Sequence, residues 1–155
     1  MKTLNHIPSL KTAILLFATI TTTLLAENKE AITHSFLGVG KANQVVIVGE
    51  DGKVQWRYGV PASDGWVLPS GNVLLALYGT KDFPHGGVAE INRKTKKIVW
   101  SYKGQQKETS TVQPLSSGKF LVAELGPQPR ALIINRKGKV LKTTPLQCQK
   151  KNAHM

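Results

Sequence analysis

Short apolar segments and short polar turns alternate along the chain from residue 44 to residue 144. In KVQWRY, at 53–58, apolar and polar residues take turns, with Trp56 and Tyr58 on one side of the chain. A period of two residues is typical of a strand with one buried face. Other segments, such as NVLLALY at 72–78, are short, aliphatic and bounded by glycine, proline or charged residues, which also indicates strands. No window in this part of the chain favours a helix.

The strand-like segments repeat. Trp56 and Trp100 lie 44 residues apart, and each is followed two positions later by a tyrosine. A second phrase, WVLPSGNVLLAL at 66–77, returns as VQPLSSGKFLVAE at 112–124, and KGKVLKTTP at 137–145 is a weaker third copy of the tryptophan phrase. Self-similarity at a period of 20–50 residues is the signature of a repeat architecture.

We therefore predict an all-β fold: a partial β-propeller of about two and a half four-stranded antiparallel blades over 41–155, after an N-terminal signal peptide helix. The blade pieces are 44–58, 65–102 and 111–144, with the start of a further blade at 146–155. The expected strands are 44–48, 53–58, 65–69, 72–78, 87–92, 97–102, 111–115, 119–125, 130–136 and 139–144. Propellers close with four to eight blades, so a fragment or truncated product of a longer propeller is expected. The alternative is a small β-sandwich or a self-assembling partial propeller.

The first 26 residues predict export. A basic start with Lys2 and Lys11 precedes an uncharged run that ends at Ala26. This order is typical of a signal peptide, here 1–26, followed by a linker over 27–40. An uncleaved membrane anchor is the alternative, although the run is short for a bilayer span. The chain is therefore expected to be exported, either to the periplasm or as a secreted protein. It has one cysteine, Cys148, which excludes a disulfide within the chain.

The repeats resemble the PQQ-like repeats of quinoprotein-dehydrogenase-like propellers, whose motif reads A-x-D-x-x-T-G-K-x-x-W. INRKTKKIVW at 91–100 has Asn92 for the aspartate and Lys96 for the glycine, and ends at Trp100. In the third copy, Lys142 stands in the place of the tryptophan. The chain is similar to uncharacterised exported bacterial members. The resemblance implies that Trp56 and Trp100 are structural residues that pack between blades.

The same resemblance raises an enzymatic alternative, a fragment of a periplasmic quinoprotein-type oxidoreductase that uses pyrroloquinoline quinone (PQQ) with calcium. Calcium prefers several oxygen ligands, yet acidic residues are scarce in this chain and none cluster in the sequence. No nucleophile, histidine and acid can be grouped from the sequence either. We therefore expect no catalytic residues, no metal site and no cofactor for this chain.

The charge is strongly basic, with 21 Lys and Arg against 9 Asp and Glu, a net +12. Two expected turns on one face of the propeller form a predicted basic patch: Arg93, Lys94, Lys96, Lys97, Arg136, Lys137 and Lys139. Such a patch is either a solvated face or a contact surface for lipid headgroups or acidic polysaccharide. Nucleic acid is a disfavoured partner because the chain is exported.

The longer connections share the opposite face, where loops on a rigid scaffold often carry binding groups. Asp82, His85 and His154 lie there as candidate ligand-facing residues, with ordinary loop residues as the alternative. The sequence thus predicts an exported binding or interaction module whose partner is an unknown protein or carbohydrate.

Overall fold

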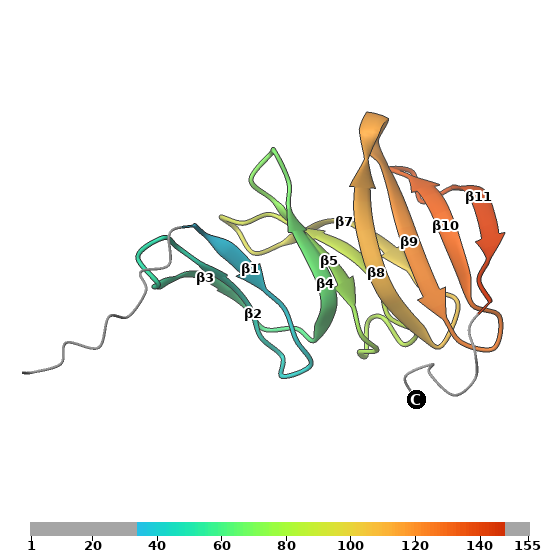
Figure 1. Cartoon of the computed structure of the whole chain (residues 1–155), viewed down its shortest axis with the longest axis horizontal. Coiled ribbons are helices and arrows are strands. Elements are labelled where there is room, and N and C mark those ends of the chain that lie inside the picture. The colour runs from blue at the N-terminus through green and yellow to red at the C-terminus, as the bar shows by residue number, and fades with distance from the viewer. Residues whose placement is uncertain (1–33, 148–155) are drawn as a thin grey trace, which may run out of the picture. The chain divides into compact units, whose positions relative to one another are not determined.

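The computed structural model describes residues 34–147, so the predicted signal peptide, His154 and Cys148 lie outside the described residues. Within that range the chain forms eleven β-strands in three antiparallel sheets and no α-helix (Figure 1). None of the described residues belongs to a helix long and apolar enough to cross a membrane.

The strands follow one another within each sheet in chain order. The first sheet contains β1 (Phe36–Gly38), β2 (Val45–Val48) and β3 (Val54–Tyr58). The second contains β4 (Ala62–Val67), β5 (Val73–Leu77), β6 (Gly87–Ile91) and β7 (Ile98–Lys103). The third contains β8 (Glu108–Leu115), β9 (Lys119–Leu125), β10 (Arg130–Asn135) and β11 (Val140–Pro145), with the short 3-10 turn η1 (Ser116–Gly118) between β8 and β9.

The all-β prediction and the two four-stranded antiparallel units are confirmed, and each expected strand overlaps an observed one. Strands β4 and β8 begin at Ala62 and Glu108, earlier than the expected 65 and 111. Strand β1 lies inside the segment 27–40 that was expected to be a linker, and its Phe36 pairs with Val48 of β2. The first sheet therefore has three strands where two were expected. Only three residues of β1 enter the ladder, too few to produce a visible alternation in the sequence.

The outer hairpins of the last two sheets are closed by the same side chain. The Oδ1 atom of Asn92 accepts hydrogen bonds from the backbone N–H groups of Lys94 and Thr95. Asn135 does the same for Lys137 and Lys139 in the β10–β11 turn. Asparagine stabilises turns in this way because its side chain satisfies backbone donors that no strand partner reaches.

Two apolar clusters hold the sheets together, and the second sheet contributes to both. Its Val73 and Leu75 pack with residues of the first sheet, such as Val45 and Ile47. The intervening Leu74 packs with residues of the third sheet. Successive residues of a strand point to opposite faces, so a strand buried on both sides is apolar throughout. This explains the continuous run VLLAL of β5, in which every residue is buried.

Candidate functional site

A tryptophan joins each sheet to the next one. The Nε1–H group of Trp56, on β3, donates a hydrogen bond to the backbone oxygen of Arg93 in the β6–β7 turn, at 2.9 Å. Trp100, on β7, donates in the same way to the backbone oxygen of Arg136 in the β10–β11 turn, at 2.7 Å. Both tryptophans that the sequence marked as structural therefore bond across a junction between sheets.

The junction between the second and third sheets is filled by an ion pair. Glu90, 4% exposed, accepts a hydrogen bond from the guanidinium of Arg136 and another, of 2.7 Å, from the side-chain amide of Asn72. The guanidinium of Arg136 also lies 5.1 Å from the ring centroid of Phe120 and 6.0 Å from that of Trp100. Charge and aromatic faces thus both stabilise this arginine.

The junction between the first and second sheets lacks those partners. Ile47 pairs with Trp56 in the ladder as Glu90 pairs with Trp100, so an apolar side chain takes the place of the carboxylate. Among the described residues, no acidic side chain forms an ion pair with Arg93. A pocket of about 630 Å³ opens here instead, and we call it the junction pocket. It is lined by Gln55, Trp56, Ser70, Gly71, Asn72, Asn92, Arg93 and Lys94.

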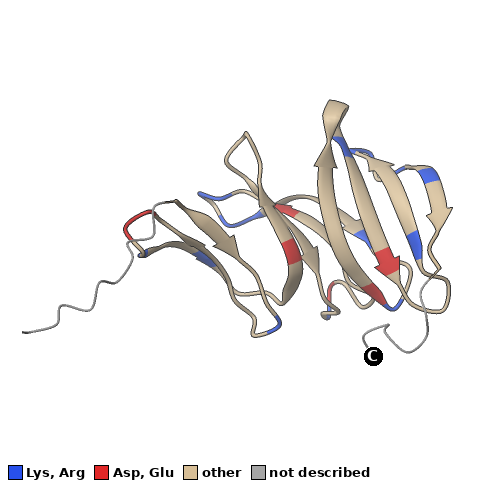
Figure 2. Ribbon diagram, viewed as in Figure 1, with Lys and Arg blue, Asp and Glu red and all other residues tan. Residues whose placement is uncertain are grey.

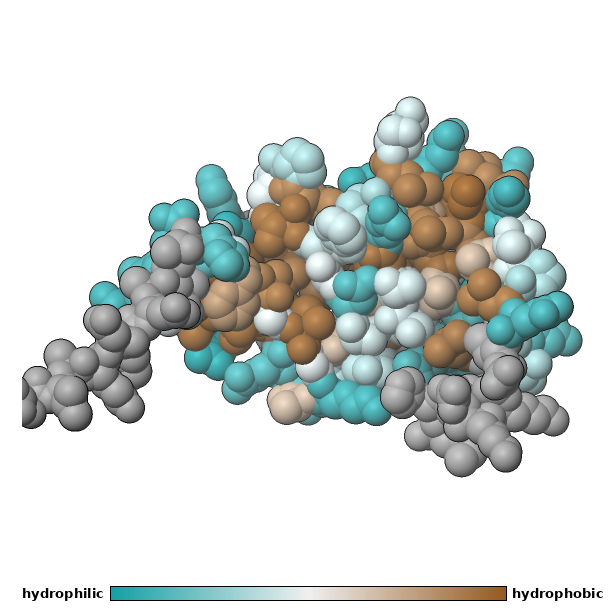
Figure 3. Space-filling model, viewed as in Figure 1, coloured by the Kyte–Doolittle hydropathy of each residue, from teal (hydrophilic) through white to brown (hydrophobic). Residues whose placement is uncertain are grey.

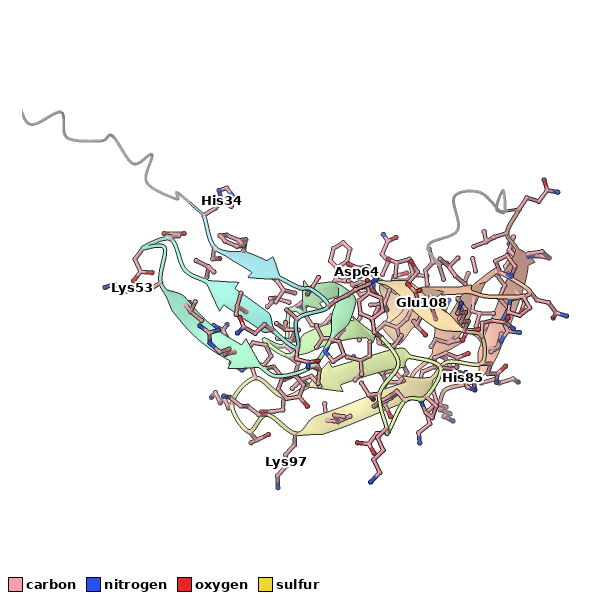
Figure 4. All side chains as sticks on the ribbon, turned by 90° about the horizontal axis from the view of Figure 1, so that it is seen from below. His34, Lys53, Asp64, His85, Lys97 and Glu108 are labelled. Carbon is pink, nitrogen blue, oxygen red and sulfur yellow. The ribbon has the colours of Figure 1, made fainter. Side chains whose placement is uncertain are left out.

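The residues of the predicted basic patch lie in different surroundings. Arg93 and Lys94 line the junction pocket. Lys96 lines a smaller hollow of about 290 Å³ that shares Gln55 and Trp56 with it. Lys97 extends from the start of β7 away from the ribbon (Figure 4). Figure 2 shows the basic residues of the β6–β7 turn gathered at that end of the second sheet.

The basic residues of the other turn have different surroundings. Arg136 is exposed, and its guanidinium pairs with the buried carboxylate of Glu90. Lys137 and Lys139 are exposed in the β10–β11 turn. Arg93 and Lys94 therefore line the junction pocket without an ion-pair partner among the described residues. Arg57 and Lys81 are likewise unpaired there, and they line two other pockets.

The loop-face candidates do not share a site. Asp82 lines a second pocket, of about 390 Å³, together with apolar residues that include Tyr58, Leu77 and Phe83. His85 is exposed on the same connection and is not among the residues that line this pocket (Figure 4). His154 lies outside the described residues.

Two further polar clusters went unrecognised in the sequence. Glu124, fully buried, accepts hydrogen bonds from the Tyr102 hydroxyl and the Gln105 backbone, both at 3.0 Å, and pairs with Arg130 at 2.8 Å. Burial, and then the nearby Glu124 carboxylate, raise the pKa of Tyr102 above its ordinary range.

The second cluster joins the strands β4 and β8. Asp64, labelled in Figure 4, accepts hydrogen bonds from the Thr111 hydroxyl and from the backbone N–H of Val112. In both clusters the polar groups bond to one another, which suits structural roles.

The quinone-and-calcium alternative requires a calcium site. Calcium is bound by six to eight oxygen atoms, mostly from carboxylates and carbonyls around one cavity. The buried carboxylates of Glu90 and Glu124 are each taken up by an arginine. Within residues 34–147, no three side chains of His, Cys, Asp and Glu are grouped as metal ligands.

No family model matches the chain, and neither does any curated protein. Among solved structures, the chain is similar to a protein of unknown function from Bacteroides caccae, with 24% identity and a TM-score of 0.57. The match covers 72% of this chain and 40% of that protein, so the chain spans less than half of its length. At this identity the similarity extends to the fold alone.

Proposed function

We propose that this chain is part of an exported, non-catalytic β-propeller whose junction pocket binds an anionic ligand. The propeller assignment is supported by three antiparallel sheets that pack in chain order, with the same tryptophan bond at both junctions. The PQQ-like repeat pattern of the sequence supports it as well. Export rests on the sequence of residues 1–26.

One observation carries the binding proposal: two cations, Arg93 and Lys94, line a pocket between two packed sheets and have no ion-pair partner among the described residues. The volume of about 630 Å³ lies in the range of ligand pockets, roughly 300–1,000 Å³. The net charge of +12 attracts polyanions to the protein, and the pocket supplies a place where one anionic group is held.

The proposal is tested by retention of the full chain on immobilised polygalacturonate, dextran sulfate and vesicles that contain phosphatidylglycerol, over a series of salt concentrations. Retention on at least one polyanion is expected, and it should weaken as salt rises because charge pairs are screened. The double variant Arg93→Gln/Lys94→Gln should lose most of this retention.

The matched control is Lys137→Gln/Lys139→Gln, which removes the same charge from the corresponding turn of the third sheet, and it should remain bound. Equal losses in the two double variants would mean that diffuse charge, and not the pocket, holds the polymer. That result, or no retention on any polyanion, would overturn the proposal.

A further inference from the structure

We infer that the junction pocket recognises the carboxylate of an acidic sugar, and that this carboxylate takes the place that Glu90 holds at the next junction. The inference rests on the proposed function and names its ligand class.

The two junctions are equivalent by register. Ile47 faces Trp56 in the ladder and Glu90 faces Trp100, and the strand irregularity follows directly after each of them. Each arginine directly follows a turn asparagine, Asn92 or Asn135. The backbone oxygen of Arg93 accepts the Trp56 N–H, and that of Arg136 accepts the Trp100 N–H. The two arginines therefore leave the backbone at the same place relative to the indole of the preceding sheet.

The second junction shows which chemistry an arginine at this place accepts. There the guanidinium of Arg136 bonds to the Glu90 carboxylate and lies against the ring of Phe120. In the aligned phrases, Val73 stands where the third sheet has Phe120. The first junction thus has Ile47 in place of the carboxylate and Val73 in place of the ring, and a pocket lies beside Arg93. A ligand carboxylate restores the charge-assisted bond that the chain itself supplies at the other junction.

The pocket is larger than a carboxylate requires, and its lining suits a sugar ring. Ser70 supplies a hydroxyl group suited to ring hydroxyls, and the buried indole of Trp56 borders the pocket. Lys94 adds a second cation at the edge of the same pocket. Two cations that line one pocket match a polymer that carries one carboxylate on each sugar unit, such as a polyuronate.

The ligand class is tested by calorimetry of the full chain with trigalacturonate, its methyl ester, a 6-sulfated galactose trisaccharide and a tetra-glutamate peptide. Trigalacturonate should bind, and each of the other three should bind about tenfold more weakly or worse. Equal binding of the sulfated sugar would overturn carboxylate recognition. Equal binding of the peptide would overturn the assignment to a sugar.

A variant that fills the pocket from within tests the position. Ile47→Glu places a carboxylate where the second junction has Glu90, so it should pair with Arg93 and weaken trigalacturonate binding about tenfold. Ile47→Gln has the same shape without the charge and should weaken binding less. If Ile47→Gln blocks binding as strongly as Ile47→Glu, the pairing with Arg93 is wrong.

Because Ile47 is buried, circular dichroism and thermal unfolding must show that each variant is folded. Arg93→Gln is the second route, since its backbone oxygen still accepts the Trp56 N–H. It should lose trigalacturonate binding without a change in thermal unfolding, and unchanged binding would overturn the inference. Retention on polyanions without trigalacturonate binding would leave the proposed function standing and remove this inference alone.

Discussion

The indole N–H of Trp56 points across a sheet junction to the backbone oxygen of Arg93, 2.9 Å away. The two residues lie 37 positions apart, and the bond fixes the β6–β7 turn against the preceding sheet. Trp100 and Arg136 repeat the arrangement one sheet later. The repeat therefore conserves a polar contact as well as an apolar one, because an indole joins ring surface to a single donor.

Replacing either tryptophan by phenylalanine removes the donor and keeps an aromatic ring. Trp56→Phe and Trp100→Phe should each lower the free energy of unfolding by about 1–3 kcal/mol, from the lost hydrogen bond and the smaller ring. Urea unfolding of the full chain, followed by circular dichroism, measures this loss. Unchanged midpoints for both variants would show that the indole bonds do not stabilise the junctions.

Glu90 and Arg136 form an ion pair, and removing either partner alone should lower the free energy of unfolding by a different amount. Glu90→Gln leaves a guanidinium whose side chain is 47% exposed and can be solvated, so a loss of about 1–2 kcal/mol is expected. Arg136→Gln leaves a carboxylate that is 5% exposed and should cost about 2–4 kcal/mol. The double variant should cost less than the sum of the two, and additive losses would contradict a direct interaction.

The β10–β11 turn depends on a left-handed backbone at Gly138, where φ is +74° and no atom lies within 4 Å of an added Cβ. Gly138→Ala should cost about 1–2 kcal/mol through backbone conformation alone. Gly40→Ala is the matched control, because Gly40 also has open space around it but no positive φ. The control should be neutral or slightly stabilising in urea unfolding.

In the corresponding turn of the second sheet, a substitution to glycine should stabilise the chain. Lys96 adopts a φ of +57° at the position that Gly138 holds in the third sheet. Lys96→Gly should therefore stabilise the chain by up to about 1 kcal/mol, since glycine accepts this conformation without a steric penalty. A lower urea midpoint for Lys96→Gly would contradict this account of the turn.

The raised pKa of Tyr102 predicts a loss of stability in alkali. The folded state holds the phenolic proton more tightly than the unfolded state, whose pKa is near 10.0. The contribution of Tyr102 is therefore complete below about pH 10 and declines as the pH rises above it. Tyr102→Phe should destabilise the chain by about 1–2 kcal/mol at pH 8, because Glu124 loses a donor.

The difference between wild type and Tyr102→Phe should then shrink between about pH 9.5 and pH 11, measured by urea unfolding at each pH. Burial also raises the pKa of Tyr58. Tyr58 is present in both proteins, so its effect cancels in the difference. A difference that stays constant with pH would mean that Tyr102 does not titrate differently in the two states.

The strands could be predicted because their signal is local. Alternation in KVQWRY, aliphatic runs such as VLLAL and turns at glycine or asparagine each occupy a few consecutive residues. The repeat then supplied the grouping into four-stranded units. Strand β1 was missed because Phe36–Gly38 has neither alternation nor a turn sequence of its own, and its place is set by pairing with β2.

The site depends on residues that are distant in sequence, and this limited its prediction. The sequence placed Arg136 in a basic patch but could not show its pairing with Glu90, which lies 46 positions earlier. A signal was present nonetheless. The three sheets place Ile47, Glu90 and Ile133 opposite Trp56, Trp100 and Lys142, and only Glu90 is charged among apolar equivalents. A buried carboxylate requires a cation, and Arg136 supplies it.

The third sheet ends the tryptophan series, because Lys142 of β11 lies where β3 and β7 carry an indole. Its outward face carries the partly exposed Leu121, Ala123 and Ile133, and Figure 3 shows apolar side chains at the surface over β8 and β9. If a second copy of residues 62–103 were inserted after residue 145, its sheet would pack against a third sheet that has no tryptophan to bond across the junction. Lys142→Trp would supply the missing donor, so lengthened arrays should be built on that background.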